Sequence, residues 1–183
     1  MTDGVQTIEG GTGDPARPLS RSHKSEKKRR AIMRAATDII NAKSFALATM
    51  TEIAASLELR DAALYYYFPS KQALAYACHC RSLETYERLL SEADGDERAG
   101  SAKLRHFLRG MLFDAEEHGA QLYLGDYTYL DPEQRKVIAE WTERLTRRLE
   151  QFLKDGIDDG SVVPCETELV VQLLLGMLIW LAK

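Results

Sequence analysis

The sequence has few cysteines and no long apolar run, and both shortages restrict the class of protein. Its three cysteines are odd in number, so they do not form a paired disulfide framework. We therefore expect a reduced, cytoplasmic protein. The apolar stretch 169–182 is too short and too near the end of the chain for a membrane span, and no apolar segment follows a basic start at the N-terminus. Neither a membrane partner nor a signal peptide is predicted.

Recognisable catalytic and metal-binding motifs are also missing. The chain has no glycine-rich phosphate loop and no nucleophile elbow. Cys78, His79 and Cys80 look like a ligand set, but helical residues two apart point roughly 200° apart, so one ion cannot bind both sulfurs. We predict no catalytic residue, no metal and no cofactor, and therefore no enzyme. Two alternatives remain: an enzyme whose Asp and His meet only in the fold, and a purely structural helical dimer without DNA binding.

Strand patterns with hairpin turns are absent as well, so the predicted fold is all-α. The five prolines lie mostly outside the periodic segments. Three helix starts carry capping signals, at Thr49, Ser70 and Asp131. The polar segment 91–101 is a loop and the nearest feature to a domain boundary. Apolar periodicity predicts helices at about 24–42, from 49, 61–67, about 70–90, about 102–117, about 132–155 and from about 166 onward.

Charge is distributed unevenly along the chain. Residues 1–71 carry 11 basic and 8 acidic side chains, whereas residues 72–183 carry 13 basic and 20 acidic ones. A basic front and an acidic rear suit a DNA-binding end joined to a body that DNA repels, although ordinary charge scatter is the alternative. Residues 1–23 lack periodicity, and we predict a disordered basic arm. The basic side chains that accumulate from Arg17 to Arg30 are expected to lie on phosphates, with a solvated helix start as the alternative.

The segment 49–71 has the pattern of a helix-turn-helix: two short helices around a tight turn, three tyrosines, and a new helix start. The N-terminal end of the second helix is predicted to read base edges in the major groove. Arg60 suits a bidentate contact with guanine, Asp61 can accept from a cytosine amino group, and Ala62 is small enough for a thymine methyl.

Phosphate contacts are expected on the other side of the same helix. Tyr65, Tyr66 and Tyr67 span roughly 200° of helical arc, so at least one hydroxyl must be exposed. A tyrosine hydroxyl is a good phosphate donor. Lys71, with the N-terminus of its own helix, is predicted to form a second phosphate clamp. Aromatic core packing is the alternative for the tyrosines, and Phe68 and Leu64 are better placed to take that part.

Residues from about 29 to 74 resemble the N-terminal domain of the tetracycline-repressor (TetR) family of transcriptional regulators. The most specific match is the string L-Y-Y-Y-F-P-S-K-Q-A-L, from Leu64 to Leu74, and further matches are Ala35, Ala36, Phe45, Thr49, Ile53 and Ala54. The resemblance implies a helix-turn-helix domain over 24–71 and a helical ligand-binding and dimerisation domain over 72–183, connected by the helix at about 70–90. By resemblance, the DNA-contact positions are Thr49, Thr51, Asp61, Ala62, Tyr65, Tyr66, Tyr67 and Lys71.

Three positions depart from the family pattern. Glu58 and Ser44 stand where glycine is common, and Arg60 stands where a small hydroxyl residue is common. A non-glycine residue with positive φ costs on the order of 1 kcal/mol, so the turn carries a small strain. The operator sequence cannot be inferred, because Arg60 and Asp61 lie where bases are read.

The rear of the chain suggests a dimer and a ligand pocket. The last helix is apolar on nearly every side, so one face needs cover from a twin subunit, unless the monomer buries it completely. Predicted interface residues are Leu145, Leu149, Leu174, Met177 and Leu178. The chain ends inside this helix, so we expect the natural C-terminus to lie further on. Predicted pocket residues, for which plain core packing is the alternative, are Phe107, Met111, Tyr123, Tyr127 and Trp141.

Taken together, these features predict a regulator of transcription. We expect a homodimer that binds a palindromic operator in double-stranded DNA as a repressor. A small hydrophobic or acyl-bearing effector would release it, because an apolar, aromatic pocket suits such a molecule. A ligand that favours one spacing of the two DNA-binding domains would weaken DNA binding through its differential affinity.

Overall fold

The protein is described by a computed structural model that covers residues 23–95, 99–122 and 126–181. Within these residues all regular structure is helical, as the sequence predicts, and no helix is long and apolar enough to cross a membrane. The predicted arm over 1–23 lies outside the described residues apart from His23. The helices are α1 (His23–Lys43), α2 (Met50–Ser56), α3 (Asp61–Tyr67), α4 (Lys71–Asp94), α5 (Gly100–His118), α6 (Pro132–Asp158) and α7 (Thr167–Leu181).

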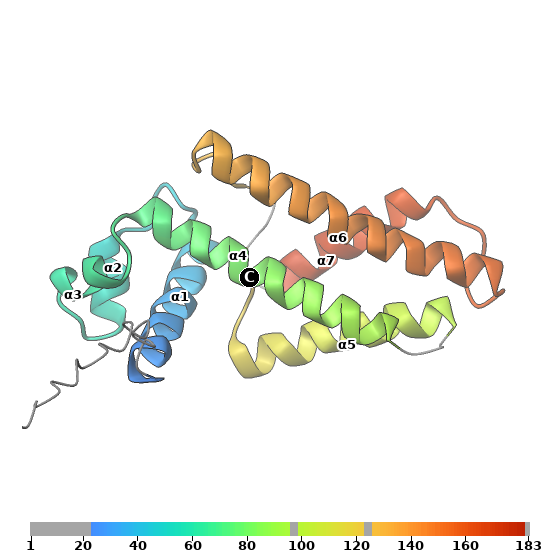
Figure 1. The fold of residues 1–183 in the computed structure, drawn as a ribbon, viewed down its shortest axis with the longest axis horizontal. Helices are drawn as coiled ribbons and strands as arrows, with labels where there is room; N and C mark the ends of the chain where they lie inside the picture. Colours follow the sequence, from blue (N-terminus) through green and yellow to red (C-terminus); the bar gives the residue numbers. More distant parts are fainter. Residues whose placement is uncertain (1–22, 96–98, 123–125, 182–183) are drawn as a thin grey trace, which may run out of the picture.

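α4 is the element that joins the two ends of the molecule (Figure 1). Its first part packs on α1, and its later part packs on α5 and α6. We call α1–α3 the head and α5–α7 the body. The position of the head relative to the body therefore depends on the contacts that α4 and the α5–α6 connection make with both.

The predicted caps start three of the helices. Side-chain oxygens of Thr49, Ser70 and Asp131 each accept a hydrogen bond from the backbone N–H three residues further on, at 3.1, 3.0 and 2.9 Å. Each bond satisfies a donor that a helix start would otherwise leave unpaired. The sequence thus identifies the beginnings of α2, α4 and α6 correctly.

α4 is longer than the sequence predicts. It continues to Asp94, and α5 already begins at Gly100, so most of the predicted loop 91–101 is helical. The reason is burial: Leu90 and Ala93 continue the apolar stripe of α4 into the body core. Burial of these side chains outweighs the polar, turn-like composition on which the loop prediction depends.

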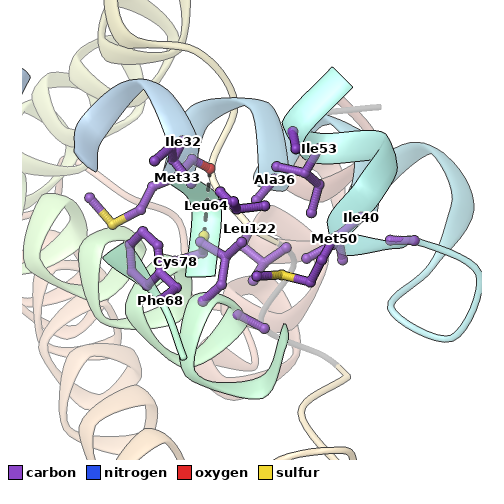
Figure 2. Packing of buried hydrophobic residues seen from close by; sticks show 14 residues of the cluster. Ile32, Met33, Ala36, Ile40, Met50, Ile53, Leu64, Phe68, Cys78 and Leu122 are labelled. Carbon is purple, nitrogen blue, oxygen red and sulfur yellow. Dashed lines mark hydrogen bonds between the residues drawn. The ribbon is translucent and has the colours of Figure 1, made fainter. Parts of the chain in front are cut away.

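The chain has two hydrophobic cores. The head core contains residues of α1, α2, α3 and the start of α4 (Figure 2). Leu122, which follows α5, is only 1% exposed and belongs to this head core. The body core is formed by α4 with α5, α6 and α7. The connection between α5 and α6 thus completes a core that is otherwise built by the head and α4.

Tyr129, in the same connection, packs against both cores. Its ring stacks on Phe45, in the turn between α1 and α2, with centroids 3.7 Å apart and planes 5° apart. Its hydroxyl pairs with His79 Nε2, on α4, at 2.8 Å. Its backbone carbonyl accepts a hydrogen bond from the side chain of Gln72. One residue therefore contacts the head, α4 and the body.

The turn between α2 and α3 is closed without glycine. Glu58 has φ 55°, in the left-handed region, and its N–H donates to Ala55 O at 3.0 Å while the N–H of Leu59 donates to Ala54 O at 2.9 Å. These two bonds form a Schellman motif, whose left-handed position favours glycine. Ser44 has φ 74°. Both are positions where the family resemblance implies glycine.

The strain at Glu58 leads to a stability prediction. We expect Glu58→Gly to raise the free energy of unfolding by about 1 kcal/mol, because glycine lacks the Cβ that opposes a left-handed conformation. Glu58→Ala removes the same charge but keeps the Cβ, so it should give no comparable gain. Urea unfolding of the three proteins measures the difference. Equal stability of the Gly and Ala variants would contradict this account.

A second prediction concerns pH. Burial lowers the pKa of His79 from 6.5 to about 4, with the carboxylate of Asp126 opposing the shift. The unfolded chain therefore takes up a proton that the folded chain resists. We expect this contribution to stability to be complete above pH 6.5 and to be lost as the pH falls towards 4. The loss should not exceed about 1.4 kcal/mol per pH unit.

His79→Phe provides the comparison for the pH prediction, because it removes the titrating ring and keeps every other titratable side chain of the protein. Urea unfolding of both proteins across this pH range should give a difference that shrinks as the pH falls. Two curves that stay parallel throughout the range would contradict a neutral, buried His79.

Candidate nucleic-acid interface

α3 is anchored by one face and exposes the other. Leu64 and the following Phe68 are buried in the head core. Tyr66 is 83% exposed, the most exposed of the three tyrosines. Positions i, i+1, i+4 and i+5 of a helix share a face. The residues exposed on this face of α3 are Asp61, Ala62, Tyr65 and Tyr66.

The residues predicted to read bases lie together at the start of α3. Arg60 precedes the helix with an exposed side chain that makes no capping hydrogen bond. The carboxylate of Asp61 accepts a hydrogen bond from Thr51 Oγ1, on α2, at 2.6 Å. Thr51 thus orients Asp61 and ties the starts of α2 and α3 together. A carboxylate has further acceptor sites, so Asp61 retains the capacity for a base contact.

A basic groove lies beside the exposed end of α3. It has a volume of about 610 Å³ and is lined by α1 and by the end of α3. Four of its five α1 residues, all except Ser25, recur at i, i+3, i+4 and i+7, which places them on one helix face. Basic side chains beside tyrosine hydroxyls are the groups that contact DNA phosphates. The lining residues are Lys24, Ser25, Lys27, Lys28, Ala31, Tyr66 and Tyr67.

The groove is a feature that the sequence only partly indicates. The basic run around Lys24 to Arg30 is visible in the sequence, but a run does not say which side chains face α3. Tyr67 is held from the other side, because Arg29 Nη1 donates to its carbonyl at 3.3 Å. The edge of the Tyr66 ring meets the ring of Tyr67, with centroids 5.3 Å apart. The helical spacing of the three lysines is the signal that could have identified the groove.

Lys71 is engaged within the chain. Its Nζ donates to Phe45 O and to Ala48 O, both at 2.8 Å, and stands 4.3 Å from the centroid of the Phe45 ring. An ammonium group has three donors, so one remains for a phosphate. The phosphate clamp stays a prediction, and the contacts of Lys71 in the structure hold the turn between α1 and α2.

Thr49 combines two functions in a similar way. Its Oγ1 accepts from Glu52 N–H and so caps α2, and its side chain is exposed. Because a hydroxyl can accept and donate at once, the O–H of Thr49 can still donate to a phosphate. Thr49 is the N-cap of α2, and Lys71 is the first residue of α4.

α7 presents an exposed apolar face. Leu169, Leu173 and Met177 are 59, 60 and 62% exposed, and their spacing of four places them on one side. Gly176 lies on the same side with open space around it. Of the predicted interface residues, Met177 lies on this face, Leu174 and Leu178 are half-buried, and Leu145 and Leu149 are buried in the body core.

The predicted pocket residues lie in or beside the body core. Phe107 and Met111 are buried within it, and Tyr127 and Trp141 are half-buried and pack against it. Tyr123 lies outside the described residues. The four described side chains therefore share one core, and their part in binding a ligand stays a prediction.

Some buried polar atoms of α4 and α6 are unpaired. Four of them have no hydrogen-bond partner in the described structure, on α4 and the first half of α6, and leaving such an atom unpaired costs about 1–3 kcal/mol. Gln134 stands in the capping-box position that follows Asp131, whereas no sequence pattern singles out Thr142. The unpaired atoms are His79 Nδ1, Gln134 Oε1, Trp141 Nε1 and Thr142 Oγ1.

The chain is similar in fold to several solved regulators. One is the TetR family transcriptional regulator PfmR from Thermus thermophilus, with 23% identity, a TM-score of 0.66 and 84% of each chain covered. A second is AibR in complex with isovaleryl coenzyme A and operator DNA, with 24% identity, a TM-score of 0.69 and coverage of 85% of this chain and 86% of that one. A gamma-butyrolactone receptor (ArpA-like protein) has 22% identity, a TM-score of 0.67 and coverage of 86% and 83%.

Family models match both ends of the chain, although none of the curated proteins compared matches it. Residues 97–183 match the tetracyclin repressor-like C-terminal domain, which corresponds to the body. Residues 32–78 match the model of bacterial regulatory proteins of the tetR family, which spans most of the head and the start of α4. With a helix-turn-helix head and a helical body each matched by its own model, the chain belongs to the TetR family of bacterial regulatory proteins.

Proposed function

We propose that the protein is a repressor of transcription that binds a palindromic operator as a homodimer and is released by a small effector. The observation that carries this proposal is the exposed face of α3 beside the basic groove of α1. An α-helix fits the major groove, and the flanking phosphates require positive and hydroxyl-bearing side chains. Both requirements are met on one side of the head. No catalytic activity is part of this proposal.

The DNA contacts divide into two groups. Arg60, Asp61 and Ala62 stand at the N-terminal end of α3, where side chains reach base edges. The hydroxyls of the tyrosines and Thr49, with the ammonium groups around the groove and the third N–H of Lys71, serve the phosphates. Thr51 gives its single proton to Asp61, so it takes part by orienting that carboxylate. The proposed DNA-binding domain covers 24–71 and the ligand-binding and dimerisation domain covers 72–183.

A second copy of the chain is the partner that suits α7. Three large apolar side chains exposed on one helix face are unfavourable in water. Gly176 between them lets another helix approach closely. Two identical faces can cover each other about a two-fold axis, which would present two heads to half-sites roughly 34–36 Å apart. Leu174 and Leu178 flank the face, and Leu145 and Leu149 support it from the body core.

The effector would bind in the body. One structurally similar protein is in complex with isovaleryl coenzyme A, and another is a gamma-butyrolactone receptor. Isovaleryl coenzyme A and a butyrolactone each carry an acyl-derived carbonyl group. The pocket residues proposed here are Phe107, Met111, Tyr123, Tyr127 and Trp141. Aromatic side chains with a few unpaired polar atoms suit an apolar molecule that carries a carbonyl or hydroxyl group. We infer an effector of that class.

DNA binding can be tested with substitutions that separate the two kinds of contact. Selection from random duplexes should yield a palindrome. Arg60→Ala should relax the preference at one symmetric pair of positions, by about 1–3 kcal/mol against the wrong base. Lys28→Ala should weaken all sequences alike and lower the slope of log affinity against log salt by about 1 for each head.

Arg109→Ala is the control for this experiment, because Arg109 is an exposed arginine on α5 in the body. It should leave both affinity and preference at the wild-type level. If selection enriches no sequence, or if Arg109→Ala changes DNA affinity as much as Arg60→Ala does, the assignment of α3 as the DNA-reading helix is wrong.

The dimer can be tested by placing charge on the α7 face. Light scattering of the wild type should give about twice the mass of one 20.6 kDa chain. Leu173→Glu and Met177→Glu should each give monomers, because burying an unpaired carboxylate in the interface costs several kcal/mol. Leu112→Glu, at an apolar residue half exposed on α5, should remain dimeric. A wild type that is monomeric at all concentrations would refute the interface.

A further inference from the structure

We propose that Tyr129 couples the interior of the body to the head, so that a molecule bound beside His79 changes the hold on Phe45 and thereby the affinity for DNA. The inference rests on the proposed function for its DNA readout. It names the residue through which an effector would act. The contacts of Tyr129 form a continuous path from the body towards α3.

The body end of this connection is the pair of His79 and Tyr129. His79 is buried, its Nε2 pairs with the Tyr129 hydroxyl at 2.8 Å, and its Nδ1 has no partner among the described residues. The rings of His79 and Tyr127 form a T-shaped pair, with centroids 6.3 Å apart and planes 87° apart. The unpaired Nδ1 is thus a buried polar atom on the same ring that holds Tyr129.

The two ring nitrogens of a neutral imidazole are coupled. When one nitrogen carries the proton the other accepts, so the partner at Nδ1 decides whether Nε2 donates or accepts. A ligand acceptor at Nδ1 would fix the proton there and require the Tyr129 hydroxyl to donate to Nε2. A ligand donor at Nδ1 would require the reverse. A bound molecule can therefore strengthen or weaken the bond that positions Tyr129.

The head end is the ring of Phe45. It lies against the Tyr129 ring, 3.7 Å between centroids, and the Lys71 ammonium stands 4.3 Å from its centroid. The same ammonium holds the carbonyls of Phe45 and Ala48. A shift of Tyr129 would disturb both the ring stack and the cation–π contact, which depend on ring position.

From Phe45 the connection continues to the DNA-reading helix. Ala48 directly precedes Thr49, the N-cap of α2. α2 in turn holds the start of α3, because Thr51 Oγ1 donates to Asp61 at 2.6 Å. Each step is a direct contact between named side chains or an adjacent position in the chain. A change in the turn between α1 and α2 would therefore alter the position of α3.

Leu122 provides a contrast within the same connection. It fills the head core, and its N–H donates to Ser82 Oγ at 2.9 Å. Ser82 Oγ donates in turn to Cys78 O, so the one proton of this hydroxyl is already used within α4. Leu122 fixes the head to α4, whereas Tyr129 is the contact whose partner, His79, retains an unpaired atom. Coupling is therefore assigned to Tyr129.

The test uses the whole 183-residue chain, three single substitutions and the Tyr129→Phe/His79→Phe double variant. Tyr129→Phe removes the hydroxyl and keeps the ring in both cores, so the chain should stay folded. His79→Phe breaks the same bond from the body side. Tyr86→Phe is the matched control: it removes a hydroxyl from a half-buried tyrosine of α4 that packs against the body core and belongs to no proposed site. Two quantities are measured: the rate of amide hydrogen exchange in residues 44–48, the turn between α1 and α2, and the affinity for the DNA that the wild type selects.

We expect Tyr129→Phe and His79→Phe each to speed exchange over 44–48 by about fivefold, the effect of losing one buried hydrogen bond on local opening. The double variant should exchange no faster than either single variant, because both remove one bond. DNA affinity should change by about threefold or more in both. Tyr86→Phe should leave exchange and affinity at the wild-type values.

The outcomes separate this inference from the proposed function. Wild-type exchange over 44–48 in both Tyr129→Phe and His79→Phe would overturn the coupling, even if the wild type binds DNA. Faster exchange in both, with a wild type that binds no DNA, would support the coupling and refute the proposed function. An equal effect of Tyr86→Phe would also overturn the coupling, because it would show a general loosening of the body.

Discussion

The stack of Lys71, Phe45 and Tyr129 is the interaction on which the arrangement of this molecule depends. An ammonium group lies on one aromatic ring, which lies on a second ring, and the ammonium also holds two backbone carbonyls of the same turn. The three residues come from the start of α4, the α1–α2 turn and the α5–α6 connection. Without this stack the head would be joined to the body mainly through α4 and Leu122. The Tyr129 end of the stack also bonds His79, so a change in the position of His79 would be felt in the stack.

Several side chains of the head combine a structural and a proposed DNA-binding task. Lys71 holds the turn with two of its donors, Thr49 caps α2, and Thr51 orients Asp61. A contact surface whose side chains are already held loses less entropy on binding. The same bonds make the surface dependent on the position of α2. A small movement of α2 would displace the proposed base-reading and phosphate-binding groups together.

The body carries two further features that its own chain leaves incomplete. The α7 face exposes Leu169, Leu173 and Met177, and four buried polar atoms between α4 and α6 lack partners within the described part of the chain. Apolar exposure and unpaired polar burial are both unfavourable, and both are relieved by association. We relate the first to a second copy of the chain and the second to an effector. Among the unpaired atoms, His79 Nδ1 is the one whose ring bonds Tyr129, through the other nitrogen, and Tyr129 in turn contacts the head.

Local patterns in the sequence determined the all-α fold, the caps at Thr49, Ser70 and Asp131, and the extent of α3, because periodicity and capping act within a few residues. The glycine-like turn at Glu58 could also be inferred, since a family motif fixes its conformation. The end of α4, the burial of Leu145 and Leu149, and the engagement of Lys71 could not. Each of these depends on residues distant in the chain. The end of α4 and the burial of Leu145 and Leu149 depend on the body core, and the contacts of Lys71 depend on the turn between α1 and α2. Long-range packing decides which of several suitable partners a side chain meets, and only the tertiary structure contains that information.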